Sequence, residues 1–294
     1  MQSHHISVAG HPFHYLTWGD PILPPLLMLH GFPEYSAAWD ELANRLCHRY
    51  FCIAPDQRGY GQSWAPPEVS EYAASNLVGD MAALIDALDI APCTVLGHDW
   101  GSAVAYGLAM MTPDLVAKLI VVNGVSKQYA MTGFRIGWAV ANTELIETMT
   151  NIQGHETSGP SALLQHAAVG AINGIQSSVE SLRSTLENNR NVLVQELRAF
   201  EGVHLEEPGG TFYSFPDFSH YSRDSEKLAR FLLDKVQVVT VPGKEFGREG
   251  HLRISFCGSI KEITEGIERM KWALDPNSPN ELWIGERKLV RDWT

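Results

Sequence analysis

Residues 93–112 read CTVLGHDWGSAVAYGLAMMT, in which an apolar run, a glycine-flanked aspartate and a helical pattern follow one another directly. The run Cys93–Leu96 predicts a buried strand, and the apolar spacing over Ser102–Thr112 predicts a helix. Two glycines flank Asp99 and permit a turn sharp enough to push the central side chain above a sheet. Asp is also favoured at a helix N-cap. Asp99 is therefore either a displayed nucleophile or a capping residue.

Short apolar runs alternate with helical patterns throughout the first 124 residues. The predicted strands are Pro12–Trp18, Leu26–Leu29, Phe51–Ala54, Cys93–Leu96 and Leu119–Val122. The predicted helices are Ser36–Arg49, Leu77–Leu88 and Ser102–Thr112. This alternation is typical of a parallel sheet with crossover helices. In such folds the binding and catalytic residues lie in the loops at the carboxyl ends of the strands.

The charge pattern excludes one class of partner and divides the chain. The formal net charge is -12, and no basic stripe is present that would displace phosphate counterions, which argues against a nucleic-acid partner. Residues 1–124 hold 12 acidic and only 4 basic side chains, whereas the remainder holds 22 and 18. Such a break in composition hints at separate origins for the two parts.

The remaining bulk features indicate an ordinary globular protein. The four cysteines, Cys47, Cys52, Cys93 and Cys257, show no CxxC pair and no metal-ligand spacing, so we expect reduced thiols, no metal site and a cytoplasmic location. The first ten residues have no signal-peptide pattern. The most apolar stretch is interrupted by His98 and Asp99, so no membrane span is expected.

Three loop motifs occur in order in the first part: HGFPEYSAAW at 30–39, DQRGYGQS at 56–63 and LGHDWGSAVAY at 96–106. Together they resemble an α/β-hydrolase of the epoxide hydrolase and haloalkane dehalogenase group, in which the elbow residue is Asp. The resemblance implies that Asp99 attacks an sp³ carbon to give an alkyl ester, which water activated by a His then hydrolyses. It also implies an oxyanion hole formed by the backbone N–H groups of Phe32 and Trp100.

The hydrolase pattern ends near residue 124. In that family the chain order is nucleophile, acid, then His, so both partners of Asp99 and the substrate-binding cap should follow. The histidines that follow are His155, His166, His204, His220 and His251. None of these lies in a recognisable hydrolase loop, and His251 is the best candidate of the five.

At the string VVNGVSK, residues 121–127, the sequence pattern changes. The continuation SKQYAMTGFRIGW at 126–138, with PGGTFY at 208–213, VPG at 241–243 and LRIS at 252–255, resembles the class I, fold-type I aminotransferases of the aspartate aminotransferase family. The resemblance implies pyridoxal 5'-phosphate as cofactor and an amino acid or 2-oxo acid as substrate. Lys127 would bond to the cofactor aldehyde, Arg135 and Ser126 would hold its phosphate, and Arg253 would pair with the substrate carboxylate.

The aminotransferase pattern is also incomplete, because the family places its ring-binding Asp, its stacking aromatic ring and its first phosphate-binding turn before the lysine. Those positions hold hydrolase-like sequence here. The predicted small-domain helices are Val179–Phe200, Asp224–Lys235 and Ile260–Leu274; the predicted strands are His204–Glu206, Thr211–Phe215, Val238–Val241 and Leu252–Phe256. A hairpin is predicted from Glu281–Gly285 and Lys288–Trp293.

The fold class that follows is α/β: a partial α/β-hydrolase parallel sheet joined to an aminotransferase C-terminal portion with an α+β small domain. We expect a hydrolase part at 1–124, a remnant of the aminotransferase large domain at 125–178 and a small domain with a C-terminal hairpin at 179–294. The string LIVVNGVSK at 119–127 suits either parent as a strand. Residues 135–140 are expected to pair antiparallel at the new sheet edge, where self-association or aggregation is predicted.

Three functions remain open: an epoxide or haloalkane hydrolase that uses Asp99, a transaminase that uses Lys127, and a fusion or misassembled gene product that lacks both activities. The first two act on small molecules. The third follows because each centre retains its covalent residue and lacks the groups that complete its cycle.

Overall fold

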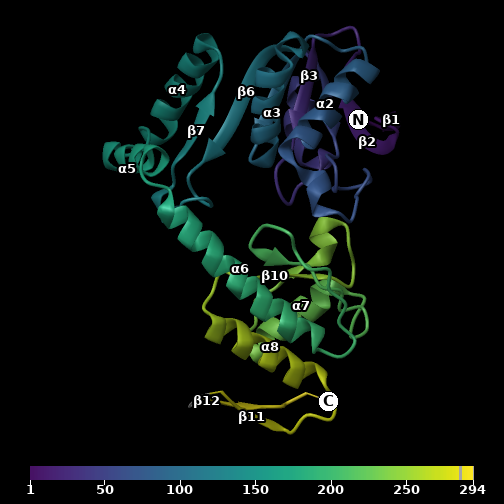
Figure 1. Ribbon diagram of the computed structural model, residues 1–294, viewed down its shortest axis with the longest axis vertical. Coiled ribbons are helices and arrows are strands. Elements are labelled where there is room, and N and C mark those ends of the chain that lie inside the picture. Colours follow the sequence, from purple (N-terminus) through teal and green to yellow (C-terminus); the bar gives the residue numbers. More distant parts are fainter. Residues whose placement is uncertain (285–286, 294) are drawn as a thin grey trace. The chain divides into compact units, whose positions relative to one another are not determined.

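A computed structural model describes residues 1–284 and 287–293 of the chain (Figure 1). The chain separates into two compact units, Met1–Ile175 and the part that begins at Gln176. No helix in the described ranges has the length and apolarity needed to cross a bilayer.

The first unit is built on a seven-stranded sheet in the order β1-β2-β4-β3-β5-β6-β7. Its strands are β1 Gln2–Val8, β2 His11–Trp18, β3 Pro25–Leu29, β4 Phe51–Pro55, β5 Cys93–His98, β6 Val116–Gly124 and β7 Gly137–Val140. Strands β4, β3, β5 and β6 are parallel neighbours, whereas β1, β2 and β7 join antiparallel. The α/β class, the five predicted strands and the antiparallel edge strand are confirmed.

Strand β1 is a strand that the apolar pattern did not reveal. It pairs with β2 along its whole length, from Gln2 opposite Thr17 to Val8 opposite His11. The two residues between the strands, Ala9 and Gly10, both have positive φ, of 50° and 87°. That combination is the type I′ turn geometry that suits a two-residue hairpin.

Helices cover both faces of this sheet. Their bounds are α1 Asp40–Leu46, α2 Ala74–Ala87 and α3 Trp100–Met111. Alternate residues of β3 point to opposite faces: Leu27 packs with α2 and α3, and Met28 packs on the side of Ala43 in α1. The helix predicted over 36–49 is wrong in its extent, because Ser36–Trp39 forms a 3₁₀ turn and the α-helix ends at Leu46.

Two helices follow β7: α4 Thr143–Thr157 and α5 Ala162–Asn173. A small core of Val125, Met131, Ile136 and Ala168 joins α5 to the β6–β7 connection. Helix α4 buries no residue. The segment beyond the hydrolase-like sequence is therefore tied to the sheet through β7 and α5.

The second unit packs three helices around a three-stranded antiparallel sheet in the order β8-β10-β9. The elements are α6 Ser177–Arg198, β8 Tyr213–Ser214, α7 Ser225–Val236, β9 Val241–Pro242, β10 Leu252–Ser255 and α8 Ile260–Leu274. Its core holds the fully buried side chains of Leu197, Phe218, Leu232 and Leu252. The predicted α+β layer is confirmed.

Two strand predictions in this unit are wrong. His204–Glu206 is not a strand: His204 forms only an isolated bridge with Asp217. The strand predicted over Val238–Val241 begins only at Val241, as β9. The residues before it still complete the end of α7, where Val238 N–H donates to Leu232 O. The predicted hairpin is present as β11 Glu281–Ile284 and β12 Arg287–Val290, and its turn residues 285–286 lie outside the described ranges.

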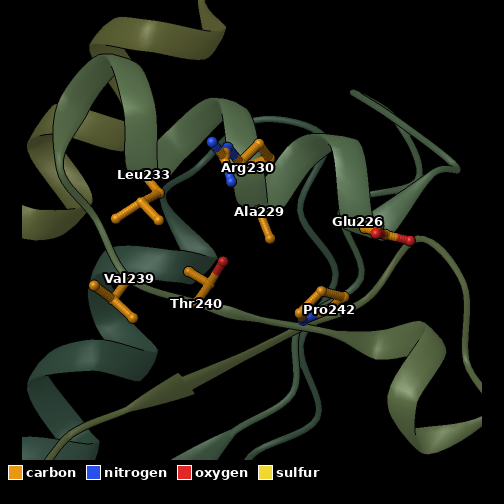
Figure 2. A pocket seen from close by; sticks show the side chains of 7 residues that line it. All are labelled: Glu226, Ala229, Arg230, Leu233, Val239, Thr240 and Pro242. Carbon is orange, nitrogen blue, oxygen red and sulfur yellow. The ribbon is translucent and has the colours of Figure 1, made fainter.

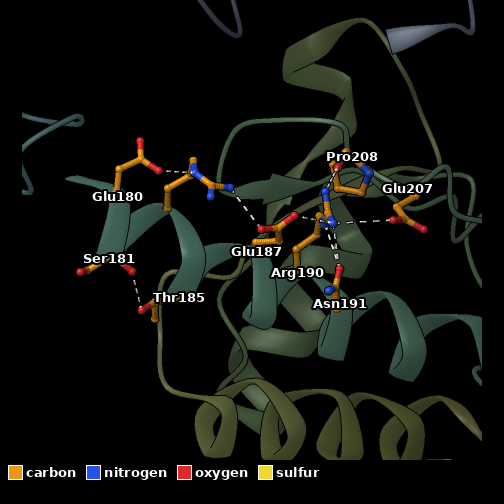
Figure 3. A network of polar contacts seen from close by, with 9 residues as sticks. Glu180, Ser181, Thr185, Glu187, Arg190, Asn191, Glu207 and Pro208 are labelled. Atoms are coloured by element: carbon orange, nitrogen blue, oxygen red, sulfur yellow. Dashed lines mark hydrogen bonds and ion pairs between the residues drawn. The ribbon is translucent and has the colours of Figure 1, made fainter. Parts of the chain in front are cut away.

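A polar network lies along α6 on the surface of the second unit (Figure 3). The Arg190 guanidinium donates to Asn191 Oδ1 (2.9 Å) and to Pro208 O (3.3 Å), and its Nη2 lies 3.7 Å from Glu187 Oε1. Exposed ion pairs contribute little to stability. The network joins α6 to the following loop without forming a reactive site.

Because each unit has its own core, truncation of a core side chain should destabilise one unit selectively. We expect Leu232→Ala to lower the unfolding free energy of the second unit by about 2–5 kcal/mol, since it leaves a cavity where the side chain is fully buried. Hydrogen exchange resolved by peptide measures the effect, with Leu108→Ala as the matched variant in the first unit. Equal loss of protection in both units for either variant would contradict separate cores.

Candidate functional site

The turn at Asp99 has the backbone of a nucleophile elbow. Asp99 lies between β5 and α3 with φ 53° and ψ −118°, a conformation that L residues rarely adopt. A Cβ added to Gly101 would lie 2.1 Å from Leu29 O, and one added to Gly97 would lie 2.4 Å from Gly101 O. Both glycines are required because strand and helix approach this closely.

The Asp99 carboxylate does not cap the helix behind it. Although Asp99 holds the N-cap position of α3, its side chain makes no capping hydrogen bond. Its Oδ2 accepts a bond from the backbone N–H of Phe32 at 3.0 Å. Gly31 allows this approach, since a Cβ there would lie 2.5 Å from Asp99 Cβ. The geometry is that of a displayed carboxylate with one oxygen held and Oδ1 available for reaction.

Only one of the two predicted oxyanion donors bonds Asp99 in the described part of the chain. That donor is Phe32 N–H; no bond from Trp100 N–H reaches the carboxylate, and the Trp100 side chain is 58% exposed. A role for Trp100 therefore stays a prediction.

Two residues beside the elbow were missed by the sequence reasoning. His98 Nδ1 lies 3.4 Å from Glu34 Oε2, and the same Glu34 oxygen accepts from Gly31 N–H at 3.2 Å. This links the loop after β3 to the loop after β5. The sequence did offer a signal for them. Glu34 lies in the motif HGFPE, and His98 lies in GHDWG directly before Asp99.

Two rings, buried His30 and half-buried Tyr60, lie in the same region without being poised for proton transfer. Burial, reinforced by the negative charge of Asp99, raises the pKa of Tyr60 to about 12. Burial lowers the pKa of His30, whose Nε2 accepts from Gln57 N–H (3.1 Å) while Nδ1 lies 2.9 Å from Gly31 O. Both His30 nitrogens are therefore engaged in holding the loop.

Asp56 anchors the loops around the elbow. Its carboxylate accepts bonds from Ser36 N–H (2.8 Å), Gln62 N–H (2.9 Å) and His14 Nδ1 (2.8 Å). Burial alone would raise the pKa of Asp56, but these hydrogen bonds outweigh it and lower the pKa overall. Asp56 is a structural carboxylate that holds the first two loop motifs in place.

The three predicted cofactor residues of the first unit, Ser126, Lys127 and Arg135, all lie in the segment that connects β6 to β7. Ser126 is half-buried, and Lys127 and Arg135 are exposed. Arg135 has a left-handed backbone (φ 54°) and donates from Nη1 to Thr132 O at 3.0 Å. Because β5 and β6 are parallel neighbours, this segment and Asp99 leave the sheet from the same edge.

The donor chemistry of this connection fits part of pyridoxal 5'-phosphate. A lysine amine suits its aldehyde, and a guanidinium with a hydroxyl suits its phosphate. The ring-side groups that the aminotransferase pattern places before the lysine have no counterpart in the sequence, since β1–β5 are formed there by hydrolase-like segments.

Arg253 and His251 lie in the second unit. The Arg253 guanidinium lies 4.3 Å from the ring centroid of Tyr213 and 5.0 Å from that of Phe246. Both distances are those of cation–π contacts, so the two rings help to position the guanidinium. His251 lies opposite Asp217 in an isolated bridge.

Other sites in the described residues carry less chemistry. No group of three or more His, Cys, Asp or Glu side chains in them could hold a metal ion. A shallow pocket of about 390 Å³ lies between α7 and the segment before β9, lined by Arg230, Leu233, Val239 and Thr240 among others (Figure 2). None of the predicted site residues lines it.

Comparison with protein families identifies two classes in one chain. Residues 24–147 match the family model for the alpha/beta hydrolase fold, and residues 94–270 match that for aminotransferase class I and II. The second match spans more than half of the chain, which therefore belongs to the aminotransferase class I and II family. The two matches overlap over 94–147, the stretch that contains both Asp99 and Lys127.

Curated relatives support the aminotransferase match. The chain is 36% identical over 176 residues to an aspartate aminotransferase from Bacillus sp. (strain YM-2), covering 58% of this chain and 45% of that protein. It is 35% identical over 181 residues to an aspartate aminotransferase from Streptomyces avermitilis, covering 58% and 44%. The chain thus spans less than half the length of these relatives.

Solved structures similar to the chain include an epoxide hydrolase from Vigna radiata, at 35% identity and a TM-score of 0.39, with 40% of this chain and 38% of that chain covered. Another is an epoxide hydrolase found in metagenomes from hot environments, at 37% identity and a TM-score of 0.40, with 41% of each chain covered.

The Asp56 network generates a prediction about stability and pH. Because the folded pKa is lowered, the stabilisation is present above the unfolded pKa of about 3.9 and is lost as pH falls through the folded value. We expect Asp56→Asn to cost roughly 1–3 kcal/mol near neutral pH and to flatten the stability profile below about pH 4. Denaturant unfolding measures this, and exposed Asp86→Asn is the control; similar losses for both would refute the assignment.

Proposed function

We propose that this chain is a fusion of an α/β-hydrolase front and an aminotransferase back that keeps a reactive covalent residue from each parent and completes neither catalytic cycle. The seam is placed within residues 119–127, with the hydrolase part at 1–124. The observation that carries the proposal is Asp99, displayed on a strained elbow and bonded to Phe32 N–H instead of capping α3.

The elbow supports one half-reaction. With Oδ2 held by Phe32 N–H, Oδ1 of Asp99 attacks a carbon of an epoxide. The carbon–oxygen bond breaks, its electron pair goes to the epoxide oxygen, and that oxygen takes a proton from water. The product is a β-hydroxyalkyl ester whose carbonyl oxygen is stabilised by the Phe32 N–H.

Hydrolysis of that ester requires a base to activate water, and the first unit offers poor ones. Its described residues contain two His–carboxylate pairs, His14–Asp56 and His98–Glu34. The first is buried and used to hold loops. The second is half-exposed and its 3.4 Å separation is long for a hydrogen bond, so Glu34 orients His98 weakly. We therefore expect the ester to persist.

Incubation with styrene oxide should add one epoxide mass to the peptide that contains Asp99, with at most very slow turnover. Asp99→Asn should lose the adduct, because an amide is not a nucleophile at this carbon. Intact and peptide mass spectrometry measures it, and Asp86→Asn serves as the matched control. Sustained diol formation without a retained adduct, or no adduct at all, would refute the proposal.

A second covalent step is proposed at Lys127. It is supported by the place of Ser126, Lys127 and Arg135 on one connection and by membership of the aminotransferase family. Pyridoxal 5'-phosphate supplies an electron sink for amino-acid chemistry when bound. Lys127 would attach its aldehyde, and Arg135 and Ser126 would hold its phosphate. In the second unit, Arg253 would donate hydrogen bonds to a carboxylate of an amino acid or 2-oxo acid. Since no ring-binding carboxylate is encoded in the usual place, transamination should be very slow.

Borohydride reduction after incubation with pyridoxal 5'-phosphate should leave a stable mass label on Lys127. Lys127→Ala should lose that label, whereas Lys118→Ala, which changes an exposed lysine on neighbouring β6, should retain it. Peptide mapping measures the site. Labels spread evenly over the surface lysines would show that no cofactor site is formed.

A further inference from the structure

A second arrangement suited to covalent chemistry lies at the β1–β2 hairpin of the first unit. Ser3 Oγ lies 2.9 Å from His14 Nε2, and His14 Nδ1 lies 2.8 Å from Asp56 Oδ2. A serine within hydrogen-bond reach of an imidazole, which a carboxylate in turn orients, is the arrangement that activates a serine nucleophile. The functions proposed for Asp99 and Lys127 make no use of Ser3.

Strand pairing places Ser3 and His14 on the same face of the sheet. His5 lies directly opposite His14, and Ser3 lies two residues before His5 on β1, so the three side chains point to one side. His14 N–H donates to Ser63 Oγ (2.9 Å), and His14 O accepts from Asp56 N–H (2.9 Å). The backbone of His14 is therefore held away from β1 while its ring contacts Ser3.

The protons of this arrangement have defined places. Burial raises the pKa of the Asp56 carboxyl, but bonds from the N–H groups of Ser36 (2.8 Å) and Gln62 (2.9 Å) help to lower it overall. An ionised carboxylate only accepts hydrogen bonds, so His14 Nδ1 donates to Asp56. The lone pair then lies on His14 Nε2, where it accepts the hydroxyl proton of Ser3.

The nucleophile is accessible, whereas the groups that activate it are protected. Ser3 is exposed, but His14 is only 3% exposed and Asp56 only 1%. Because His14 turns its backbone away from β1, the His14–His5 pair is not hydrogen-bonded, and neither is the Leu16–Ser3 pair two residues along. The Ser3 N–H therefore points to the open side of edge strand β1, where it can donate to a carbonyl oxygen.

We propose that Ser3, His14 and Asp56 form a second reactive site, which transfers the acyl group of a small activated ester to Ser3 and then to water. His14 Nε2 takes the proton of Ser3 Oγ as Oγ bonds to the carbonyl carbon. The ester bond breaks, and the leaving oxygen departs with the electron pair and takes that proton from His14. Water then attacks the acyl carbon with His14 as base, and the acyl–Oγ bond breaks to release the acid and restore Ser3.

The position of Ser3 favours one class of ester. Because Ser3 is exposed on a strand, the ester gains little binding energy from surrounding side chains. Its leaving group must therefore depart easily, as a phenolate does. An aryl acetate meets both conditions, since it is small and already activated.

A fluorophosphonate tests the site, because its phosphorus bonds to an activated serine as fluoride leaves and the product does not turn over. The full chain should gain one phosphonyl mass on Ser3, about a hundredfold faster than on exposed Ser7 of the same strand. Ser3→Ala should lose the label, and Ser7→Ala should keep it. Peptide mass spectrometry measures both rates. Absence of label on Ser3, or equal rates at Ser3 and Ser7, would overturn the proposal.

Activation by His14 is tested separately. His14→Gln leaves Ser3 exposed but removes the base, so labelling of the folded variant should fall about a hundredfold. Circular dichroism checks its fold; if it does not fold, the wild type in urea serves instead and should lose the label. Release of p-nitrophenol from p-nitrophenyl acetate should fall in Ser3→Ala and persist in Ser7→Ala. Wild-type labelling of folded His14→Gln, labelling of Ser3 that persists in urea, or undiminished release by Ser3→Ala would contradict the assignment.

Discussion

The backbone of β6 is the constraint on which the rest of the first unit depends. A strand inside a sheet must have partners for both rows of its N–H and C=O groups, because unpaired buried groups are costly. Strand β5 pairs with one side of β6 from Cys93 to His98, and β7 pairs with the other. The strand β7 that pairs with the second side is formed by aminotransferase-like sequence, Gly137–Val140.

The elbow does not depend on the sequence after residue 124. Its position follows from the pairing of β5 with β3 and β6 and from the close approach of Gly101 to Leu29 O. The bond from Asp99 N–H to Val122 O (3.3 Å) ties it directly to β6. The groups that hold Asp99 are thus encoded before residue 124, so its carboxylate keeps its geometry whatever sequence follows.

The sequence predicted the sheet and most helices because continuous apolar runs and helical spacing are local signals, as in Leu26–Leu29 and Ser102–Thr112. It missed β1, where histidines and serines alternate with few apolar residues and pairing with β2 decides the conformation. It identified Asp99 through its glycines. It missed the His98–Glu34 pair because the contact joins two loops 64 residues apart, and the two loop motifs do not by themselves show which of their side chains meet.

Loss of catalytic partners need not disturb folding, because the two properties rest on different contacts. The cores of both units are formed by apolar side chains within each unit, such as Leu84 with Leu108 and Leu197 with Leu232. Groups that complete a catalytic cycle are commonly polar and under strain, and their removal often leaves stability unchanged or improves it. A chain joined at a shared strand can therefore keep both units well packed without the groups that a catalytic cycle at Asp99 or Lys127 would require.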